Sequence, residues 1–384
     1  MSDSLRGRTA VIGVAESDLG EVGGGASEMD LIGQATARAI EDAGIAKADI
    51  DAIFTASIRH PLPALSVAEY LGIRPRYHDT TMDGGSSFVS HALHAAAAIA
   101  AGECEVALIA YGSVQRSAAG GLQDVGHKFL FEEVYSPRRP MGMYALAAAR
   151  HMHQYGTTFE QLAEVAVSAR RWAQLNPKAF KRDDLTVEDV MESRVICSPI
   201  RALDCCLVTD GGGAVIMTSA ERAADGPHPP VYLLGAAEAI SHDNISTMPD
   251  LTVTAAKESG ERAYAMAGLG PSDIDVVQLY DAFTINVVLF LEDLGFCEKG
   301  EGGSFVEGGR IAPGGELPVN TNGGGLSYCH PGMFGIFTII EAVRQLRGEA
   351  GDRQIPDAVT ALAHGNGGVL SSQSTAIFGS QEAL

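Results

Sequence analysis

The sequence predicts an α/β protein built from two related halves, with a helical segment between them. Patterns typical of buried strands alternate with helical patterns in both halves, which predicts a mostly parallel sheet covered by helices. Residues 43–53 recur as residues 267–277, and each copy runs from a helix end at glycine through an Asp-Ile-Asp turn into an apolar strand. This recurrence indicates internal duplication. With 384 residues, the chain is long enough for two such halves.

The first half contains two strand and helix units in sequence. An apolar strand over residues 9–14 precedes a helical pattern over residues 29–43, which ends at Gly44. Glycine is the residue type favoured just beyond a helix end. An alanine-rich helix that ends near Gly102 then leads into an apolar strand over residues 105–112.

The second half repeats this order. The helix that ends at Gly268 leads into the recurrent strand, and a helical pattern over residues 336–347 leads into a strand over residues 358–365. We therefore place the first half at residues 1–225 and the second half at residues 226–384. Ligands of such sheets bind beyond the carboxyl ends of the strands, where the glycine-rich turns of this chain lie.

A segment of about residues 114–198 departs from the repeat. It contains helical patterns over residues 143–155 and 158–173, and the Thr157-Thr158 pair before Glu160 is typical of a helix start. We interpret the segment as an inserted lobe that covers the site.

The composition restricts the class of partner. The formal net charge is −21, which argues against nucleic acid and anionic membrane surfaces. An anionic small ligand remains possible, because a local cluster of Arg and Lys acts over a short screening length. No apolar run is long enough for a membrane span, and no secretion signal precedes the first strand, so the cytoplasm is the expected compartment.

Two common kinds of cofactor site are not predicted. The 6 Cys residues have no zinc-finger spacing and the 11 His residues are scattered, so we expect no metal. The Gly23-Gly24-Gly25 run lacks the pattern of a dinucleotide-binding turn.

Four motifs occur in an order that points to one family. They are Tyr144–Thr157, Leu203–Ala214, the Tyr-Asp-Ala-Phe-Thr turn at Tyr280–Thr284, and the Gly-rich turn at Asn322–Gly332, which contains Cys-His-Pro-Gly. Together they resemble the thiolase superfamily, in its branch of sterol-carrier-protein thiolases. The resemblance implies a duplicated thiolase fold of five layers, αβαβα, in which the inserted lobe is the loop domain.

One departure from that family changes the expected chemistry. Thiolases carry a nucleophilic Cys where the first-half helix begins. The resemblance places this position at Gly85, give or take one residue, and there is no Cys between residues 1 and 103. Acyl-enzyme formation on sulfur is therefore not expected at this turn. We expect Gly84, Gly85 and Ser86 to open the helix and to contact the substrate. Ser86 is an alternative nucleophile, although serine would need an adjacent base.

The remaining polar groups suit cleavage of a carbon–carbon bond. Donors aimed at a thioester oxygen stabilise an enolate, which forms when the bond between Cα and Cβ of a β-hydroxy acyl-CoA breaks. This retro-aldol reaction needs a base near the hydroxyl and an acid for the enolate carbon, but no covalent intermediate. The candidate catalytic residues are Tyr280, Tyr328 and His330, with His330 as the expected donor to the thioester oxygen.

Other residues are candidates for substrate binding. His364, Asn366 and Gly367 stand where thiolases have a second catalytic Cys, and we expect the glycines to let backbone N–H groups approach the ligand. Coenzyme A carries phosphates, and the basic residues that could meet them are Arg138, Arg139, Arg170, Arg171 and Lys178.

This combination is similar to the thiolase-like aldolases of bacterial steroid side-chain degradation. The resemblance implies a ketosteroid plus propionyl-CoA or acetyl-CoA as products, with coenzyme A as part of the substrate and no other cofactor. It also implies a homodimer that pairs the strand at residues 106–111 across a two-fold axis, and a DUF35-type partner with an OB-fold and a zinc ribbon.

Two alternatives belong to different classes. One is an acyltransferase or Claisen-type thiolase that uses Ser86 or an unexpected Cys, and acylation of the protein by acyl-CoA would distinguish it. The other is a non-catalytic acyl-CoA or lipid carrier, in which substitution of Tyr280 would change nothing that can be measured.

Overall fold

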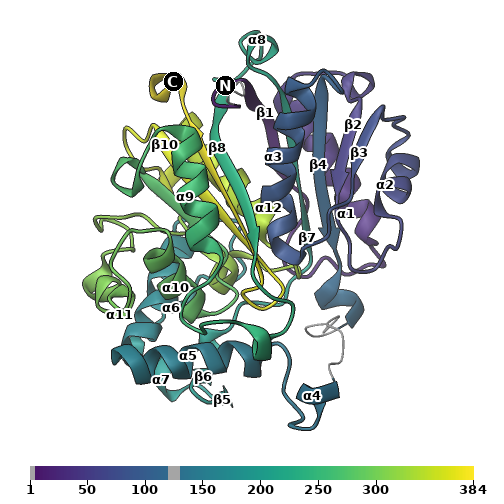
Figure 1. Cartoon of the computed structure of the whole chain (residues 1–384). Coiled ribbons are helices and arrows are strands. Elements are labelled where there is room, and N and C mark those ends of the chain that lie inside the picture. The colour runs from purple at the N-terminus through teal and green to yellow at the C-terminus, as the bar shows by residue number, and fades with distance from the viewer. Residues whose placement is uncertain (1–4, 120–129) are drawn as a thin grey trace.

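The computed structural model describes residues 5–119 and 130–384, and its strands form one large mixed sheet (Figure 1). The strand order is β3-β2-β4-β7-β1-β8-β11-β10-β9. The bounds of these strands are β1 Thr9–Glu16, β2 Ala52–Thr55, β3 Tyr77–Asp79, β4 Val106–Ser113, β7 Gly211–Ser219, β8 Val231–Ile240, β9 Val276–Leu279, β10 Thr360–Gly367 and β11 Ser372–Gly379. A separate short hairpin joins β5 (Val195–Cys197) and β6 (Ile200–Arg201).

The helices lie on both sides of this sheet and between its halves. Their bounds are α1 Glu28–Ala43, α2 Pro63–Leu71, α3 Ser87–Ala100, α4 Leu130–Glu133, α5 Met141–Tyr155, α6 Phe159–Gln174, α7 Val187–Glu192, α8 Ala220–Ala223, α9 Ala256–Ala267, α10 Thr284–Asp293, α11 Gly302–Phe305 and α12 Gly335–Arg347. Helices α3 and α12 pack against each other and contact strands of both halves, whereas α1 contacts first-half strands and α9 contacts second-half strands. The expected five-layered α/β fold is confirmed.

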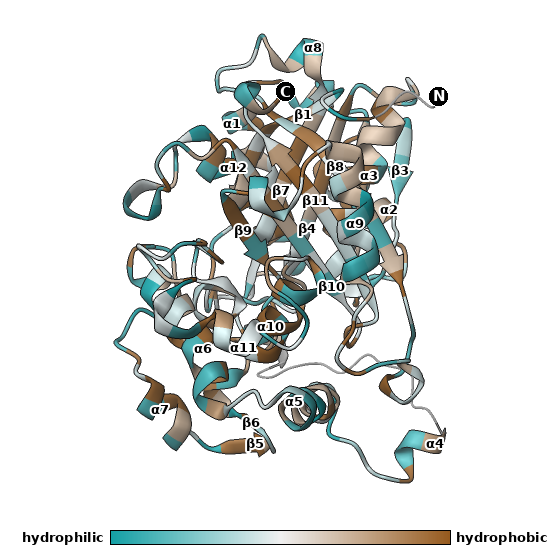
Figure 2. Cartoon of the chain, turned by 60° about the vertical axis from the view of Figure 1, so that its left-hand side comes forward, coloured by the Kyte–Doolittle hydropathy of each residue, from teal (hydrophilic) through white to brown (hydrophobic). Residues whose placement is uncertain are grey.

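The sequence patterns explain where the helices begin and end. Helix α1 begins after Ser27, whose hydroxyl accepts the N–H of Asp30 in a capping box. It ends at Gly44, which has a φ of 64°. Gly268 ends α9 in the same way with a φ of 67°, as the internal repeat predicts. In Figure 2 hydrophobic residues gather along the strands of the sheet, whereas the outer helix α9 is more hydrophilic.

The prediction of a mostly parallel sheet is wrong. Only three of the strand pairs in the described sheet are parallel, namely β2 with β3, β2 with β4, and β9 with β10. The pairs that join β1, β7, β8 and β11 to their neighbours are antiparallel. Strands β10 and β11, for example, are joined by a short turn, and a short connection can only join antiparallel neighbours.

The position of the expected dimerisation strand also needs correction. Residues 106–111 lie in β4, which pairs with β2 on one side and β7 on the other, so its backbone has no free edge. The described edge strand of the first half is β3, the short Tyr77–Asp79 strand. A strand with two neighbours cannot pair across a two-fold axis.

The inserted segment forms a lobe below the sheet in Figure 1, where α5, α6 and α7 lie together. Helix α6 begins after Thr158, which caps the N–H of Gln161, and α5 ends at Gly156 with a φ of 78°. Helix α6 contacts α10 and the Gly-rich turn of the second half. No helix of the described chain is both long and apolar enough to pass through a lipid bilayer.

A buried carboxylate connects the two halves and the lobe. Glu16, at the end of β1, is 3% exposed and forms an ion pair with Arg344 of α12. Its oxygens also accept the hydroxyl of Tyr328 at 2.7 Å and the ammonium of Lys178 at 3.1 Å. Burial alone would raise the pKa of Glu16, but the charges of Arg344 and Lys178 hold it well below its usual range.

Substitution Glu16→Gln should destabilise the protein by about 3–5 kcal/mol at pH 7, because it leaves the Arg344 guanidinium buried without its partner charge. The folded-state pKa of Glu16 lies below its ordinary value of 4.5, so its stabilising effect is present above that pH and is lost as the pH falls.

Urea unfolding of the wild type and the variant from pH 7 to pH 3 measures this difference. The gap in the free energy of unfolding should narrow below about pH 4.5. Glu316→Gln is the control, since Glu316 pairs with Arg310 at an 80% exposed position and should matter little. A difference in the free energy of unfolding that stays constant across this pH range would show that the Glu16 charge does not stabilise the fold.

Candidate active site

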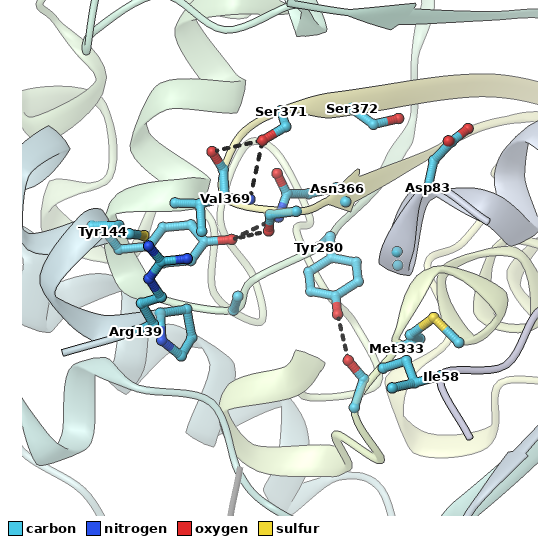
Figure 3. Close-up of a pocket in the computed structure, with 18 of the residues that line it drawn as sticks. Ile58, Asp83, Arg139, Tyr144, Tyr280, Met333, Asn366, Val369, Ser371 and Ser372 are labelled. Carbon is cyan, nitrogen blue, oxygen red and sulfur yellow. Dashed lines mark hydrogen bonds between the residues drawn. The ribbon is translucent and has the colours of Figure 1, made fainter. Parts of the chain in front are cut away.

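A cavity of about 500 Å³ lies where the first half, the second half and the lobe meet. Its wall is formed by the turn before α3, by α5, by the turn after β9, by the His330 turn and by the loop after β10. Figure 3 shows Tyr280 in the middle of this wall, with Asn366 and Tyr144 on one side and Met333 and Ile58 on another. The sequence-predicted residues that line the cavity are Gly84, Gly85, Tyr280, His330, Asn366 and Gly367.

The Tyr280 ring lies directly against the backbone of Gly85. A Cβ atom added to Gly85 would lie 2.1 Å from Cε2 and 2.6 Å from Cζ of the Tyr280 ring. Real Cβ contacts are never this short, so the ring fills the space that any side chain at position 85 would need. The space beside the backbone of Gly85 is therefore occupied by a phenol from the other half of the chain.

Gly84 and Gly367 close the same corner of the cavity. Gly84 has a φ of 77°, and a Cβ there would lie 2.9 Å from the backbone nitrogen of Gly368. A Cβ on Gly367 would lie 1.5 Å from the carbonyl oxygen of Asp83. Only glycine permits this close approach of the turn before α3 and the loop after β10.

Tyr280 and His330 form a hydrogen-bonded pair in the cavity wall. The Tyr280 hydroxyl lies 3.0 Å from His330 Nε2 and 3.2 Å from the carbonyl oxygen of Gly332. Burial raises the pKa of Tyr280 well above 10, and it lowers the pKa of His330 to about 4. Both groups are therefore neutral at pH 7, and the pair can pass a proton without a charge on either group at rest.

Asp281 has a structural part in the site. Its carboxylate accepts the backbone N–H of Gly325 at 2.6 Å and that of Leu326 at 3.2 Å, so it holds the Gly-rich turn that carries His330. Burial raises the pKa of Asp281 to about 7. A Cβ on Gly324 would lie 2.0 Å from this carboxylate, which explains the run of glycines.

Three of the sequence-predicted residues lie apart from the cavity wall. The Tyr328 hydroxyl points into the buried cluster and donates to Glu16. Ser86 donates to the carbonyl of Asp83 at 3.0 Å and contacts the Ser372 hydroxyl at 2.9 Å, with no adjacent base among the described residues that would activate it. His364 lies behind Asn366 and is fully buried.

The basic residues of the lobe have separate partners. Arg139 lines the cavity, where it pairs with Glu132 at 3.1 Å and Glu133 at 3.3 Å. Arg170 binds Ser327 and Asp183, and Lys178 binds Glu16. Arg138 and Arg171 are exposed. Of these five, Arg139 alone reaches the cavity.

The structure adds Tyr144 and Cys206 to the wall, which the sequence reasoning missed as site residues. The Tyr144 hydroxyl accepts from the Asn366 side chain at 3.0 Å, and its ring lies 4.4 Å from that of Phe283. Burial raises the pKa of Cys206 well above 9, so its sulfur is a thiol at pH 7. Tyr144 begins one of the motifs found in the sequence, but that motif does not show its place in the cavity, because its partners Asn366 and Phe283 come from the other half. In the described chain, no three His, Cys, Asp or Glu side chains are grouped to hold a metal ion.

Comparison with known proteins gives a consistent picture. The family model described as "Thiolase C-terminal domain-like" matches residues 237–380. The chain is 36% identical to an acetyl-CoA acetyltransferase of Methanothermobacter thermautotrophicus, over 96% of this chain and 98% of the relative. It is also 36% identical to a steroid side-chain-cleaving aldolase of Thermomonospora curvata, over 96% and 97%. A 17-hydroxy-3-oxo-4-pregnene-20-carboxyl-CoA lyase of Mycobacterium tuberculosis is 35% identical, over 90% and 92%.

Solved structures agree with the fold. The structure named "Ltp2-ChsH2(DUF35) aldolase" superimposes with a TM-score of 0.88 at 34% identity, and the match covers 98% of both chains. Human mitochondrial 3-ketoacyl-CoA thiolase superimposes with a TM-score of 0.72 at 18% identity, over 98% of this chain and 99% of that one.

Substitution Gly85→Ala should lower kcat at least tenfold, because the added methyl displaces the Tyr280 ring from its place beside His330. Steady-state kinetics and a spectroscopic check of folding measure the effect. Gly142→Ala is the matched control, since a Cβ there meets nothing closer than 3.6 Å. Full activity of Gly85→Ala would show that the ring does not need this space.

Proposed function

The chain belongs to the thiolase superfamily, in the branch of sterol-carrier-protein thiolases, and from the chemistry of its cavity we propose that it cleaves a β-hydroxy acyl-CoA by a retro-aldol reaction. It is a carbon–carbon lyase that forms no covalent acyl-enzyme. The observation that carries the proposal is the Tyr280 ring in the space that a side chain at position 85 would need. The resemblance to thiolases places their nucleophile at this turn.

The proposed reaction begins at the β-hydroxyl of the substrate. The Tyr280 hydroxyl hydrogen turns from the Gly332 carbonyl to Nε2 of His330, 3.0 Å away, and passes to that nitrogen while the Tyr280 oxygen accepts the hydroxyl proton of the substrate. The new carbonyl forms as the bond between Cα and Cβ breaks, and the electron pair of that bond moves to the thioester as an enolate. Cα then takes one proton, which the Tyr280–His330 pair can return. The proton lost from oxygen thus balances the proton gained by carbon.

The neutral state of both groups supports this relay. A resting phenolate in the buried cavity would be strongly disfavoured by desolvation, as the raised pKa of Tyr280 reflects. The neutral imidazole beside the phenol has a lone pair that can receive the proton. Burial disfavours the charged imidazole, and the enolate that forms in the same step supplies the compensating negative charge. Tyr328 takes no part in this scheme, because its hydroxyl is bound to Glu16.

The substrate class follows from the relatives and from the cavity wall. Two relatives are named for cleavage of steroid side chains or of a pregnene carboxyl-CoA thioester. The apolar side chains of Ile58, Met82, Met143 and Met333 in the wall suit a fused-ring skeleton. We therefore assign a steroid side-chain CoA thioester as substrate, with a ketosteroid and propionyl-CoA or acetyl-CoA as products. Coenzyme A enters as part of the substrate.

The partners belong to the same proposal. The name of the structural neighbour includes a DUF35 component, which supports a DUF35-type partner for this chain. A homodimer core that carries two copies of this partner, in the cytoplasm, completes the proposed assembly. The first-half edge that a dimer could use is β3.

An acyltransferase is the second candidate, because a relative of the same identity is named acetyl-CoA acetyltransferase. Sequence identity thus does not separate the two functions, but the geometry favours the lyase. Ser86 has no adjacent base among the described residues, and the raised pKa of Cys206 disfavours the thiolate that acyl transfer requires.

Substitution Tyr280→Phe should lower kcat by about 10²–10⁴-fold with little change in KM, because it removes the proton carrier and keeps the ring. The assay incubates β-hydroxy acyl-CoA with the protein, with and without a DUF35-type partner, and detects the ketone and the shorter acyl-CoA by mass spectrometry. Tyr264→Phe is the control, since Tyr264 is a buried tyrosine bonded to the Leu294 carbonyl.

Three results would contradict the proposal. Unchanged cleavage by Tyr280→Phe would remove the phenol from the mechanism. An acyl adduct on the protein, or a lengthened acyl-CoA, would favour the transferase. Wild-type binding without cleavage of any β-hydroxy acyl-CoA tested would favour the carrier.

A further inference from the structure

A chain of buried hydrogen bonds runs from the cavity into the second half of the sheet. Asn366 Nδ2 donates to the Tyr144 hydroxyl at 3.0 Å, and its Oδ1 accepts from Gln373 Nε2 at 2.8 Å. Gln373 Oε1 lies 2.9 Å from His364 Nε2, and His364 Nδ1 lies 2.9 Å from the Thr375 hydroxyl. Asn366 and Tyr144 line the cavity, whereas Gln373, His364 and Thr375 lie behind its wall.

The order of donors and acceptors along these hydrogen bonds fixes the orientation of the Asn366 amide. Since Gln373 Nε2 can only donate, Asn366 must present its oxygen to Gln373 and its nitrogen to Tyr144. Gln373 Oε1 then accepts from His364 Nε2–H. In the opposite orientation, the Tyr144 hydroxyl would have to donate its hydrogen to Asn366. The hydroxyl would then no longer donate to the Gly368 carbonyl, which lies 3.1 Å away. The orientation with the Asn366 nitrogen toward Tyr144 satisfies one more group.

This orientation leaves a donor at the cavity. One N–H of the Asn366 amide is used by Tyr144, and the other has no acceptor among the residues that the structure describes. Asn366 also lies beside the Tyr280 ring. A Cβ added to Gly85 would lie 2.1 Å from Tyr280 Cε2 and 2.7 Å from the backbone carbonyl oxygen of Asn366. Figure 3 shows the Asn366 and Tyr280 side chains on the same part of the wall.

We infer that the Asn366 amide donates to the thioester oxygen as it becomes an enolate, and that Gln373 is a positioning residue that keeps this amide in its donating orientation. The inference rests on the proposed function and names the group that stabilises its intermediate. A fixed donor in a dry cavity stabilises developing negative charge more than a mobile one, because it needs no reorganisation. Tyr280 and His330 then transfer the hydroxyl proton, and Asn366 donates a hydrogen bond to the thioester oxygen.

The kinetic test uses four variants and one control. Asn366→Ala and the nearly isosteric Asn366→Asp should each lower kcat for cleavage by about 10²–10³-fold, with KM changed less than about threefold. Gln373→Glu cannot donate, so it should turn the Asn366 amide around and lower kcat by about 10²-fold. In the double variant Asn366→Ala with Gln373→Glu, kcat should equal that of Asn366→Ala alone.

The control is Ser374→Ala, since Ser374 is a neighbour in β11 that bonds to Ser90 instead. It should keep the wild-type kcat. Losses that add in the double variant would show that Gln373 has only a structural role, and would overturn its part of the inference. Wild-type kcat in both Asn366 variants would overturn the inference entirely.

A binding test separates this inference from the proposed function, because it needs no turnover. S-carboxymethyl-coenzyme A places a carboxylate near the position of the enolate, whereas coenzyme A has no such anion. The wild type should bind the carboxymethyl compound about 10–100-fold more tightly than Asn366→Ala, with equal affinity for coenzyme A. Equal affinity of both proteins for the carboxymethyl compound, with wild-type cleavage intact, would overturn the inference and leave the function standing. Absence of wild-type cleavage would instead overturn the function.

Discussion

The site depends on the fact that a side chain at position 85 and the ring of Tyr280 cannot be present together. The turn before α3 comes from the first half and Tyr280 comes from the second half, so the constraint acts across the interface of the duplicated fold. With glycine at position 85, the phenol reaches His330, and residue 85 itself places no side chain in the cavity. This one steric exclusion therefore places a phenol, and no side chain of residue 85, in this part of the cavity wall.

A second constraint keeps the parts of the site in register. The buried Glu16 carboxylate joins β1, α12, the Gly-rich turn and the lobe through Arg344, Tyr328 and Lys178. Asp281 holds the same turn from the other side. Because His330 is carried by this turn, its distance from Tyr280 is set by two carboxylates that lie outside the cavity wall. Such supporting groups are needed wherever a site must be held within a fraction of an ångström.

Local sequence patterns predicted the parts of the structure that depend on local physics. Helix ends at Gly44 and Gly268 follow from backbone conformation, and the turns that carry Gly85, Tyr280 and His330 were each found from motifs within short segments. The shared space of Gly85 and Tyr280 is a contact between the two halves, which those motifs did not predict. The antiparallel pairing, the interior position of β4 and the direction of Tyr328 depend on contacts between distant segments. Tyr328 and His330 are two residues apart, but the turn between them is irregular, so spacing alone could not show that they point to different places.

The exclusion at Gly85 also restricts the routes by which such a site could have arisen from a cysteine-dependent ancestor. A tyrosine at position 280 in the observed pose cannot precede the loss of the cysteine, because the two would overlap. The loss of a side chain at position 85 must therefore come first or at the same step.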